Sequence, residues 1–333
     1  STDRSDEAMT ETYGTAIRDA FEYVLETYPE AFVIGQGLWS PWYVGSSMTD
    51  LDKQFGIDRL IDTPVAESAC TGAAVGASLA GMKPIVVHPR MDFALYAMDA
   101  MVNQAAKWSH MTGGQAHPSL TVRAIINRGG EQGAQHSQAL HSWFAHIPGL
   151  RVVAPATVRD ARDLLIASVL SPDPVVYIDD RWLYEQEDPL PPITELDLSL
   201  VGPSVLVPGE DITLVGSGYA TLLAKQATGL LASSGISAEV IDVRVLNPFN
   251  PELIISSVAK TRNLLVVDGS WASCGFSAEV IASVSEELAP GVLATSPRRL
   301  TLPAAPAPTS RVLQDDYYPT HEMVADIARK MLS

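Results

Sequence analysis

The sequence predicts an α/β fold built of two parallel-sheet domains, and three observations carry that prediction. Short apolar strands alternate with helical segments from residue 13 onwards. The expected strands are nearly continuous runs of valine and isoleucine, as in 84–88 and 121–127, which is typical of parallel strands covered on both faces. The chain has 333 residues, and at roughly 150 residues per domain this length favours two domains.

The first half begins with an amphipathic helix, because Tyr13, Ile17, Phe21, Val24 and Leu25 fall on one face at helical spacing. Apolar runs then predict strands at 32–35, 84–88, 121–127, 151–155 and 175–179. Between them, helical patterns lie at 68–81, 92–108 and 158–170.

A break follows the last of these strands. Residues 188–209 are rich in proline and have no helical period, so we expect a linker there, between a first domain at 1–187 and a second at 210–333. The second domain repeats the alternation, with strands expected at 211–218, 237–243, 263–269 and 292–296, helices between them, and a last helix at 320–332.

Composition and charge narrow the classes of function. The formal net charge of −17 gives an acidic surface that repels phosphate backbones, so no nucleic-acid partner is expected. Cys70 and Cys274 are too few for a disulfide framework and fit a reducing compartment. No apolar run reaches the ~18 residues of a membrane span, and the acidic start does not resemble a signal peptide. We therefore expect a cytoplasmic protein.

Glu67 stands at the start of a helix rich in alanine, glycine, serine and threonine. A carboxylate in the first turn complements the helix dipole, and this structural role alone could explain it. The small residues also allow close packing, and a carboxylate held in a partly dry place is a strong hydrogen-bond partner. Phe93 has two interpretations as well, as a core aromatic or as a residue near the ligand-binding end of a strand.

A glycine-rich stretch at 127–136 follows a strand and permits close approach of the backbone to a ligand. It lacks the lysine of a phosphate-binding P-loop. His136 ends this stretch and is best placed to meet a ligand. His141 and His146 follow at intervals that spread the three histidines around a helix, which disfavours a zinc site. A partial dinucleotide fingerprint at 215–221 lacks its third glycine, so an NAD-binding dehydrogenase is a weak alternative.

Several segments together resemble the beta subunit of the decarboxylating component of 2-oxo acid dehydrogenases, of the pyruvate and branched-chain type. In the first half these are DTPVAES, DFALYAMDAMVNQAAKWSHMTGGQ, GAQHSQALHSWFAHIPGLRVVAPAT and DPVVYIDDRWLYE. In the second half they are DITLVGSG, SAEVIDVRVLNPFNPELIISSVAKT, LLVVDGSW and LPAAPAP. The resemblance implies a thiamine diphosphate pyrimidine-binding domain followed by a transketolase-like C-terminal domain.

The resemblance also implies half of an active site. In that family the alpha subunit holds the diphosphate and Mg²⁺ with a Gly-Asp-Gly motif and a later asparagine, which this sequence lacks, so an α2β2 assembly is expected. A lipoyl-bearing acyltransferase is a possible further partner. By resemblance, Glu67 hydrogen-bonds a pyrimidine nitrogen and favours the imino tautomer that generates the ylide. Phe93 stacks on the pyrimidine, and His136 donates a proton or orients the substrate.

A structural K⁺ ion is a further implication, because beta subunits of the family often bind one through carbonyls near the segment 167–174. The matching residues here are Ser168, Ser171 and Asp173.

Some residues depart from the family pattern. Gly35-Gln36-Gly37 replaces the usual Gly-Glu-Glu or Gly-Glu-Asp. Extra cationic side chains suggest contacts to a more polar substrate, such as a phosphorylated or nucleotide-linked sugar, although surface drift would also explain them. These candidate substrate residues are His88, Arg90, Arg128 and His141.

Three functions stay open at this point, beside the weak alternative of an NAD-binding dehydrogenase. The first is oxidative decarboxylation of a 2-oxo acid with acyl transfer to a lipoyl domain. The second is transketolase-like transfer of an acyl or ketol unit to a carbonyl acceptor. The third is a non-catalytic structural subunit.

Overall fold

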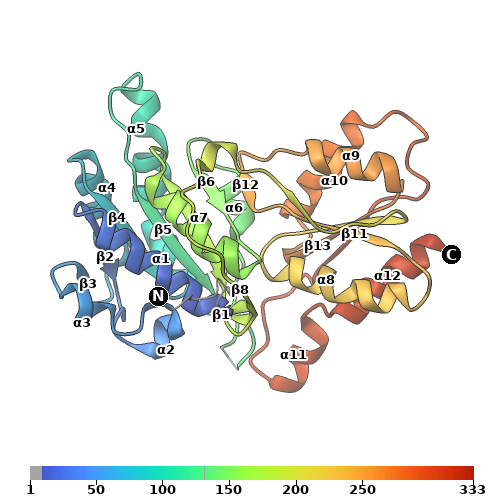
Figure 1. Cartoon of the computed structure of the whole chain (residues 1–333), viewed down its shortest axis with the longest axis horizontal. Coiled ribbons are helices and arrows are strands. Elements are labelled where there is room, and N and C mark those ends of the chain that lie inside the picture. Colours follow the sequence, from blue (N-terminus) through green and yellow to red (C-terminus); the bar gives the residue numbers. More distant parts are fainter. Residues whose placement is uncertain (1–9, 131) are drawn as a thin grey trace, which may run out of the picture.

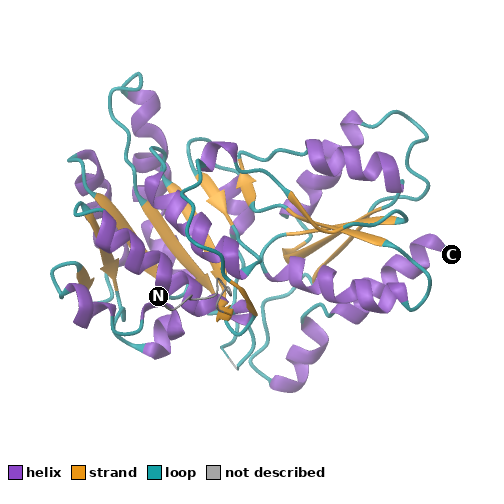
Figure 2. Cartoon of the chain, in the orientation of Figure 1, coloured by secondary structure: helices purple, strands orange, loops and turns teal. Residues whose placement is uncertain are grey.

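The computed structural model describes residues 10–130 and 132–333. The described chain forms two α/β halves that lie side by side, each with a central sheet and helices on both faces (Figure 1 and Figure 2). This confirms the predicted fold class. No helix in the described part of the chain is long and apolar enough to cross a membrane.

The first sheet has seven strands in the order β12-β6-β7-β5-β4-β2-β3. All of its pairings are parallel except that of β12 with β6. The strands are β2 (Ala31–Gly35), β3 (Leu60–Asp62), β4 (Lys83–His88), β5 (Thr121–Ile126), β6 (Arg151–Val153), β7 (Val175–Asp180) and β12 (Val245–Asn247).

Two apolar clusters cover the two faces of this sheet. Along β4, Ile85 and Val87 face one cluster and Val86 faces the other, because successive side chains of a strand point to opposite faces. The first cluster is completed by α1 (Tyr13–Thr27) and α7 (Val158–Leu170), and the second by α4 (Glu67–Leu79). The five apolar residues predicted to share one face of α1 are all buried, and Thr12 caps the start of that helix.

The second sheet has five strands in the order β14-β13-β10-β11-β9, parallel except for the pairing of β9 with β11. Helices α8 and α12 cover one face and α9 and α10 the other (Figure 1). The elements are β9 (Ser204–Val207), β10 (Ile212–Gly216), α8 (Tyr219–Ala232), β11 (Ala238–Asp242), α9 (Glu252–Thr261), β13 (Leu264–Trp271), α10 (Phe276–Glu287), β14 (Arg298–Leu302) and α12 (His321–Leu332).

Shorter elements complete the chain. Strands β1 (Thr10–Thr12) and β8 (Glu187–Pro189) pair with each other, so the beginning of the described chain is tied to the segment that leaves the first sheet. The short helices are α2 (Pro41–Val44), α3 (Leu51–Phe55), α5 (Ala106–Met111), α6 (His141–Ala145) and α11 (Arg311–Tyr317).

The structure differs from the sequence prediction in several places. The expected helix at 92–108 is a succession of 3-10 turns at Met91–Ala97, a π-helical stretch at Asp99–Ala105 and the start of α5. The prediction of a strand at 292–296 is wrong, because this segment has no regular secondary structure and β14 begins after it, at Arg298. The proline-rich stretch 188–209 also contributes β9. Short strands such as β12 form by pairing with residues distant in sequence, so local patterns carry little sign of them.

Candidate active site

A cavity of about 810 Å³ opens at the carboxyl ends of β2 and β4, the edge where ligands bind in parallel sheets. It brings together Glu67, Phe93, His136 and Arg90, four residues that the sequence analysis singled out. The full lining is Gln36, Tyr43, Val65, Ala66, Glu67, Ser68, Ala69, Arg90, Phe93, Tyr96, Gln132 and His136. We call it the strand-end cavity.

Glu67 is the first residue of α4 and is half-buried at the cavity wall. The preceding residue, Ala66, makes no side-chain hydrogen bond that would cap the helix. The carboxylate of Glu67 in the first turn interacts favourably with the helix dipole. No hydrogen bond to another described residue occupies its carboxylate, which leaves both oxygens available to a ligand. A small void of about 10 Å³ lies against Glu67, between Cys70 and His88.

Phe93 and His136 meet edge to face, with ring centroids 5.3 Å apart and an interplanar angle of 74°. Their two segments are held together by Asp92, whose Oδ1 accepts hydrogen bonds from the backbone N (3.1 Å) and side-chain Nε2 (2.9 Å) of Gln138. Burial raises the pKa of the Asp92 carboxyl, and the Gln138 hydrogen bonds oppose this shift. The loop that carries His136 is thus fixed relative to the aromatic ring.

Gln36 lies at the end of β2, where the resemblance leads one to expect a glutamate. Its Oε1 is buried and has no hydrogen-bond partner among the described residues. Because a buried polar atom without a partner is costly, this oxygen is suited to accept a hydrogen bond from a donor that enters the cavity. The substitution is visible in the sequence, but Gln36 was not among the predicted site residues.

His88 lies beneath α4 and does not line the strand-end cavity. Its Nε2 is 3.3 Å from Thr71 Oγ1, which in turn donates to the backbone oxygen of Glu67 at 2.8 Å. Burial lowers the pKa of His88 to about 4, so the imidazole is neutral at neutral pH. Its place in the structure is a support under the first turn of α4.

Arg128 and His141 lie at the seam between the two halves, away from the lining of the strand-end cavity. Arg128 donates from Nε to Asp180 Oδ2 at 2.6 Å and from Nη1 to the backbone oxygen of Gly269 at 2.8 Å. His141 Nε2 is 2.9 Å from Asp268 Oδ1. Both side chains are buried. The contacts of Arg128 with Gly269 and of His141 with Asp268 join the two halves of the chain.

Arg90 is the one cationic candidate that faces the strand-end cavity, and the structure adds Arg181 near it. Arg90 donates to the backbone oxygen of Pro89 (2.9 Å) and to Gln132 Oε1 (3.3 Å). Arg181 donates to the backbone oxygen of Tyr43 (3.0 Å), a cavity residue, and lies over the Tyr184 ring. Burial and the nearby Arg181 charge lower the pKa of Arg90. Neither guanidinium pairs with a carboxylate of the described residues.

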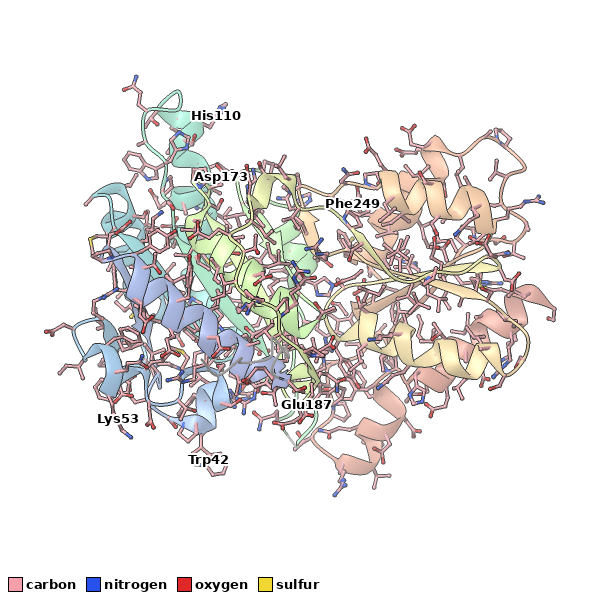
Figure 3. All side chains as sticks on the ribbon, in the orientation of Figure 1. Trp42, Lys53, His110, Asp173, Glu187 and Phe249 are labelled. Atoms are coloured by element: carbon pink, nitrogen blue, oxygen red, sulfur yellow. The ribbon has the colours of Figure 1, made fainter. Side chains whose placement is uncertain are left out.

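The candidate cation loop is engaged in local hydrogen bonds. Ser168 Oγ donates to the backbone oxygen of Leu164 (2.6 Å), and Asp173 pairs with Arg151 at 2.8 Å. The backbone oxygen of Ser171 accepts from Ser119 Oγ at 2.6 Å. Asp173 and Trp42 lie at opposite ends of the first half in Figure 3. No group of three or more acidic, histidine or cysteine side chains within 10–130 and 132–333 is arranged to hold a metal ion.

Comparison with known proteins assigns both halves. Residues 10–186 match the family model "Transketolase, pyrimidine binding domain", and residues 204–324 match "Transketolase, C-terminal domain".

Individual relatives extend over nearly the whole chain. The beta subunit of acetoin:2,6-dichlorophenolindophenol oxidoreductase from Cupriavidus necator is 34% identical over 95% of this chain and 96% of its own length. The mitochondrial pyruvate dehydrogenase E1 component subunit beta from Chaetomium thermophilum is 34% identical over 96% of this chain and 85% of its own.

Among solved structures, one described as "Split gene transketolase, inactive beta4 tetramer" superposes with a TM-score of 0.77. It is 20% identical and covers 97% of this chain and 98% of its own. This likeness shows the shared fold.

Proposed function

Because the chain belongs to the transketolase-like family of E1 beta subunits of 2-oxo acid dehydrogenases, we propose that it binds the aminopyrimidine of thiamine diphosphate in a heteromeric enzyme. The observation that carries this proposal is the convergence of Glu67, Phe93 and His136 on one strand-end cavity. When bound, the coenzyme supplies the electron sink for cleaving a bond next to a carbonyl.

The residues of the cavity fit an aminopyrimidine. The Glu67 carboxylate and the Gln36 Oε1 have no hydrogen-bond partner among the described residues. The carboxylate is suited to hydrogen-bond a ring nitrogen, and Oε1 can accept from an amino group. The Phe93 ring offers an apolar face for stacking. His136, held beside Phe93, is placed to donate a proton to the substrate or to orient it. In our proposal these are the roles of the four side chains.

The partner is an alpha subunit that holds the diphosphate and Mg²⁺, in an α2β2 assembly. Three observations support this. The sequence has no Gly-Asp-Gly motif for Mg²⁺, and its net charge of −17 is unsuited to holding a diphosphate alone. Apolar side chains are also exposed around the cavity, with Val65 at 75% and Tyr96 at 72% of full exposure. Exposed apolar surface beside a polar cavity is typical of a protein interface.

The remaining predictions from sequence stay part of this proposal. They are the domain limits at 187 and 209, a K⁺ ion bound by carbonyls of 167–174, and a cytoplasmic location. A lipoyl-bearing acyltransferase is proposed as acceptor if the reaction is of the pyruvate dehydrogenase type.

A second candidate reaction is transketolase-like transfer with an anionic sugar substrate. The guanidinium groups of Arg90 and Arg181 favour this reaction, because neither pairs with a carboxylate of the described residues. Arginine side chains bind anionic groups such as phosphate, and these two stand near the cavity of a chain whose net charge is −17. Acyl transfer to a lipoylated domain by the reconstituted pair would favour the dehydrogenase reaction. Cleavage of the donor without lipoyl acylation would favour the transferase.

The Arg90→Ala variant tests the anionic substrate. Loss of a charge-assisted hydrogen bond of ~1.5–3 kcal/mol should raise KM for a phosphorylated ketose by ~10- to 100-fold. We expect kcat to change far less, because Arg90 is assigned to binding. The matched control is Arg298→Ala, which removes an exposed arginine from β14. An equal KM for phosphorylated ketose in the Arg90 variant and the control would refute the assignment.

A further inference from the structure

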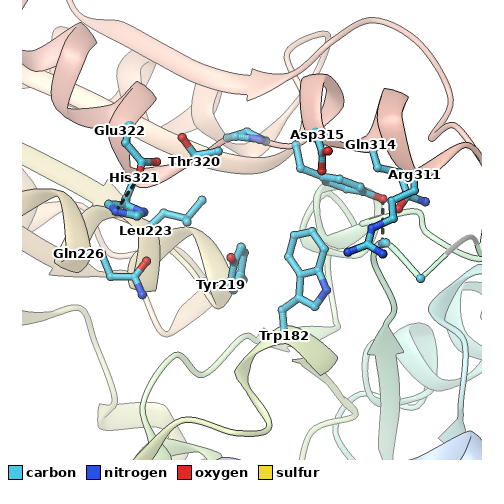
Figure 4. A pocket seen from close by; sticks show the side chains of 14 residues that line it. Trp182, Tyr219, Leu223, Gln226, Arg311, Gln314, Asp315, Thr320, His321 and Glu322 are labelled. Atoms are coloured by element: carbon cyan, nitrogen blue, oxygen red, sulfur yellow. Dashed lines mark hydrogen bonds and ion pairs between the residues drawn. The ribbon is translucent and has the colours of Figure 1, made fainter.

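A second cavity, of about 750 Å³, lies at the seam between the two halves (Figure 4). Its walls come from the loop after β5, from Trp182 after β7 and from the first half of α8. The remaining wall is formed by α11, the start of α12 and the segment that joins them. It shares no lining residue with the strand-end cavity. We call it the seam cavity. Its volume is sufficient for a small organic ligand.

Three aromatic rings form one wall of the seam cavity. Trp182 lies between Tyr219 and Tyr318, with ring centroids 5.0 Å and 4.9 Å away. The interplanar angles of 66° and 69° mean that each tyrosine ring stands steeply to the indole. All three residues line the seam cavity, and the side chains of Trp182 and Tyr219 can be seen at its edge in Figure 4. The faces of aromatic rings are electron-rich and attract cations, whereas the ring edges carry partial positive charge.

The aromatic wall is held rigidly. The backbone N of Trp182 donates to Asp180 Oδ1 at 3.0 Å, and the backbone N of Gly129 donates to Tyr318 Oη at 3.4 Å. Gly129 has φ +61°, and a Cβ at this position would lie 2.9 Å from the indole ring. The loop can therefore approach Trp182 this closely only with a glycine there. A preformed wall reduces the entropy lost on binding.

The charges around the seam cavity favour a cation. Its lining includes the carboxylates of Asp315 and Glu322 and the guanidinium of Arg311. Arg311 stands at the opposite end of the cavity from Glu322 (Figure 4). The Oε1 atom of Glu322 lies 3.1 Å from Nε2 of His321. The end bordered by Tyr219 and Glu322 lies away from Arg311 and therefore combines an aromatic side chain with a carboxylate, in a chain whose net charge is −17. Cations bind well to such surroundings.

We propose that the seam cavity binds a small organic ammonium ion against the rings of Trp182, Tyr219 and Tyr318, with Glu322 and Asp315 contributing long-range attraction. This site is separate from the proposed coenzyme site and does not depend on it.

The test uses choline and its neutral isostere 3,3-dimethylbutan-1-ol, measured on the full chain by saturation-transfer NMR. Cation–π attraction of ~1–2 kcal/mol predicts that choline binds ~5- to 30-fold more tightly than the isostere. Trp182→Leu and Tyr219→Leu should each abolish the preference for choline. The control is Trp143→Leu, which removes an exposed indole that lies outside the seam cavity.

Two results would overturn the proposal. One is equal binding of choline and the isostere, or no choline binding to the unsubstituted chain. The other is choline binding that survives both Trp182→Leu and Tyr219→Leu. Thermal unfolding of each variant shows whether it is folded, and Trp182→Phe, which keeps a ring, should retain part of the choline affinity if Trp182→Leu fails to fold.

Discussion

Replacing Glu67 by alanine is expected to lower kcat of the reconstituted enzyme by ~10²- to 10⁴-fold, the usual contribution of a positioned acid–base group. The carboxylate has no partner among the described residues, and it opens onto the same cavity as Phe93 and His136. Its removal should therefore cost little stability while removing the group that bonds the pyrimidine ring. Steady-state kinetics with the alpha subunit present, together with thermal unfolding, separate the two effects.

The control for this variant is Glu26→Ala, an exposed carboxylate at the end of α1. We expect Glu67→Gln to be impaired as well. The amide keeps the volume of the side chain, but unlike a carboxyl group it cannot take up and release the proton of a hydrogen bond to the pyrimidine nitrogen. Full activity of Glu67→Ala would instead support the non-catalytic subunit that the sequence left open.

Replacing Asp179 by alanine is expected to reduce the free energy of unfolding by ~3–5 kcal/mol, because it leaves Arg123 charged and unpaired in the core. Both side chains are fully buried. Arg123 donates to both oxygens of Asp179 at 3.0 and 2.8 Å, and to the hydroxyls of Ser47 and Tyr184. Burial lowers the pKa of Arg123, but Asp179 and Tyr184 outweigh it and raise the pKa above its usual value.

Chemical denaturation measures this effect. Asp326→Ala is the control, since its pair with Arg329 is exposed and should contribute only ~0–1 kcal/mol. The double variant Arg123→Met with Asp179→Leu should recover most of the lost stability, because it removes both buried charges together. A loss for Asp179→Ala no greater than for Asp326→Ala would contradict this account of the core.

The sequence predicted the elements whose own residues specify them. Residues 158–170 form α7 as expected, and the valine- and isoleucine-rich runs form the buried parallel strands. It failed where distant contacts decide the structure. The π-helical stretch Asp99–Ala105 lies inside a pattern typical of a regular helix, and β12 exists only through its pairing with β6.

The candidate site was predictable to a similar extent. Motifs identified Glu67, Phe93 and His136, which the structure gathers around one cavity, although their chemical roles stay predictions. The partner of His141 could not be foreseen, because Asp268 lies 127 residues away in the sequence. Arg181 could have been identified from its position directly after β7, at the carboxyl edge of the sheet.

Division of the coenzyme site between two polypeptides is the central claim, and equilibrium binding of thiamine diphosphate tests it most directly. The coenzyme would be titrated with Mg²⁺ into the purified chain, and into the chain mixed with an alpha subunit that carries the Gly-Asp-Gly motif and its asparagine. We predict Mg²⁺-dependent binding and turnover only in the mixture. Retention of the coenzyme with Mg²⁺ and turnover by the purified chain alone would contradict the claim.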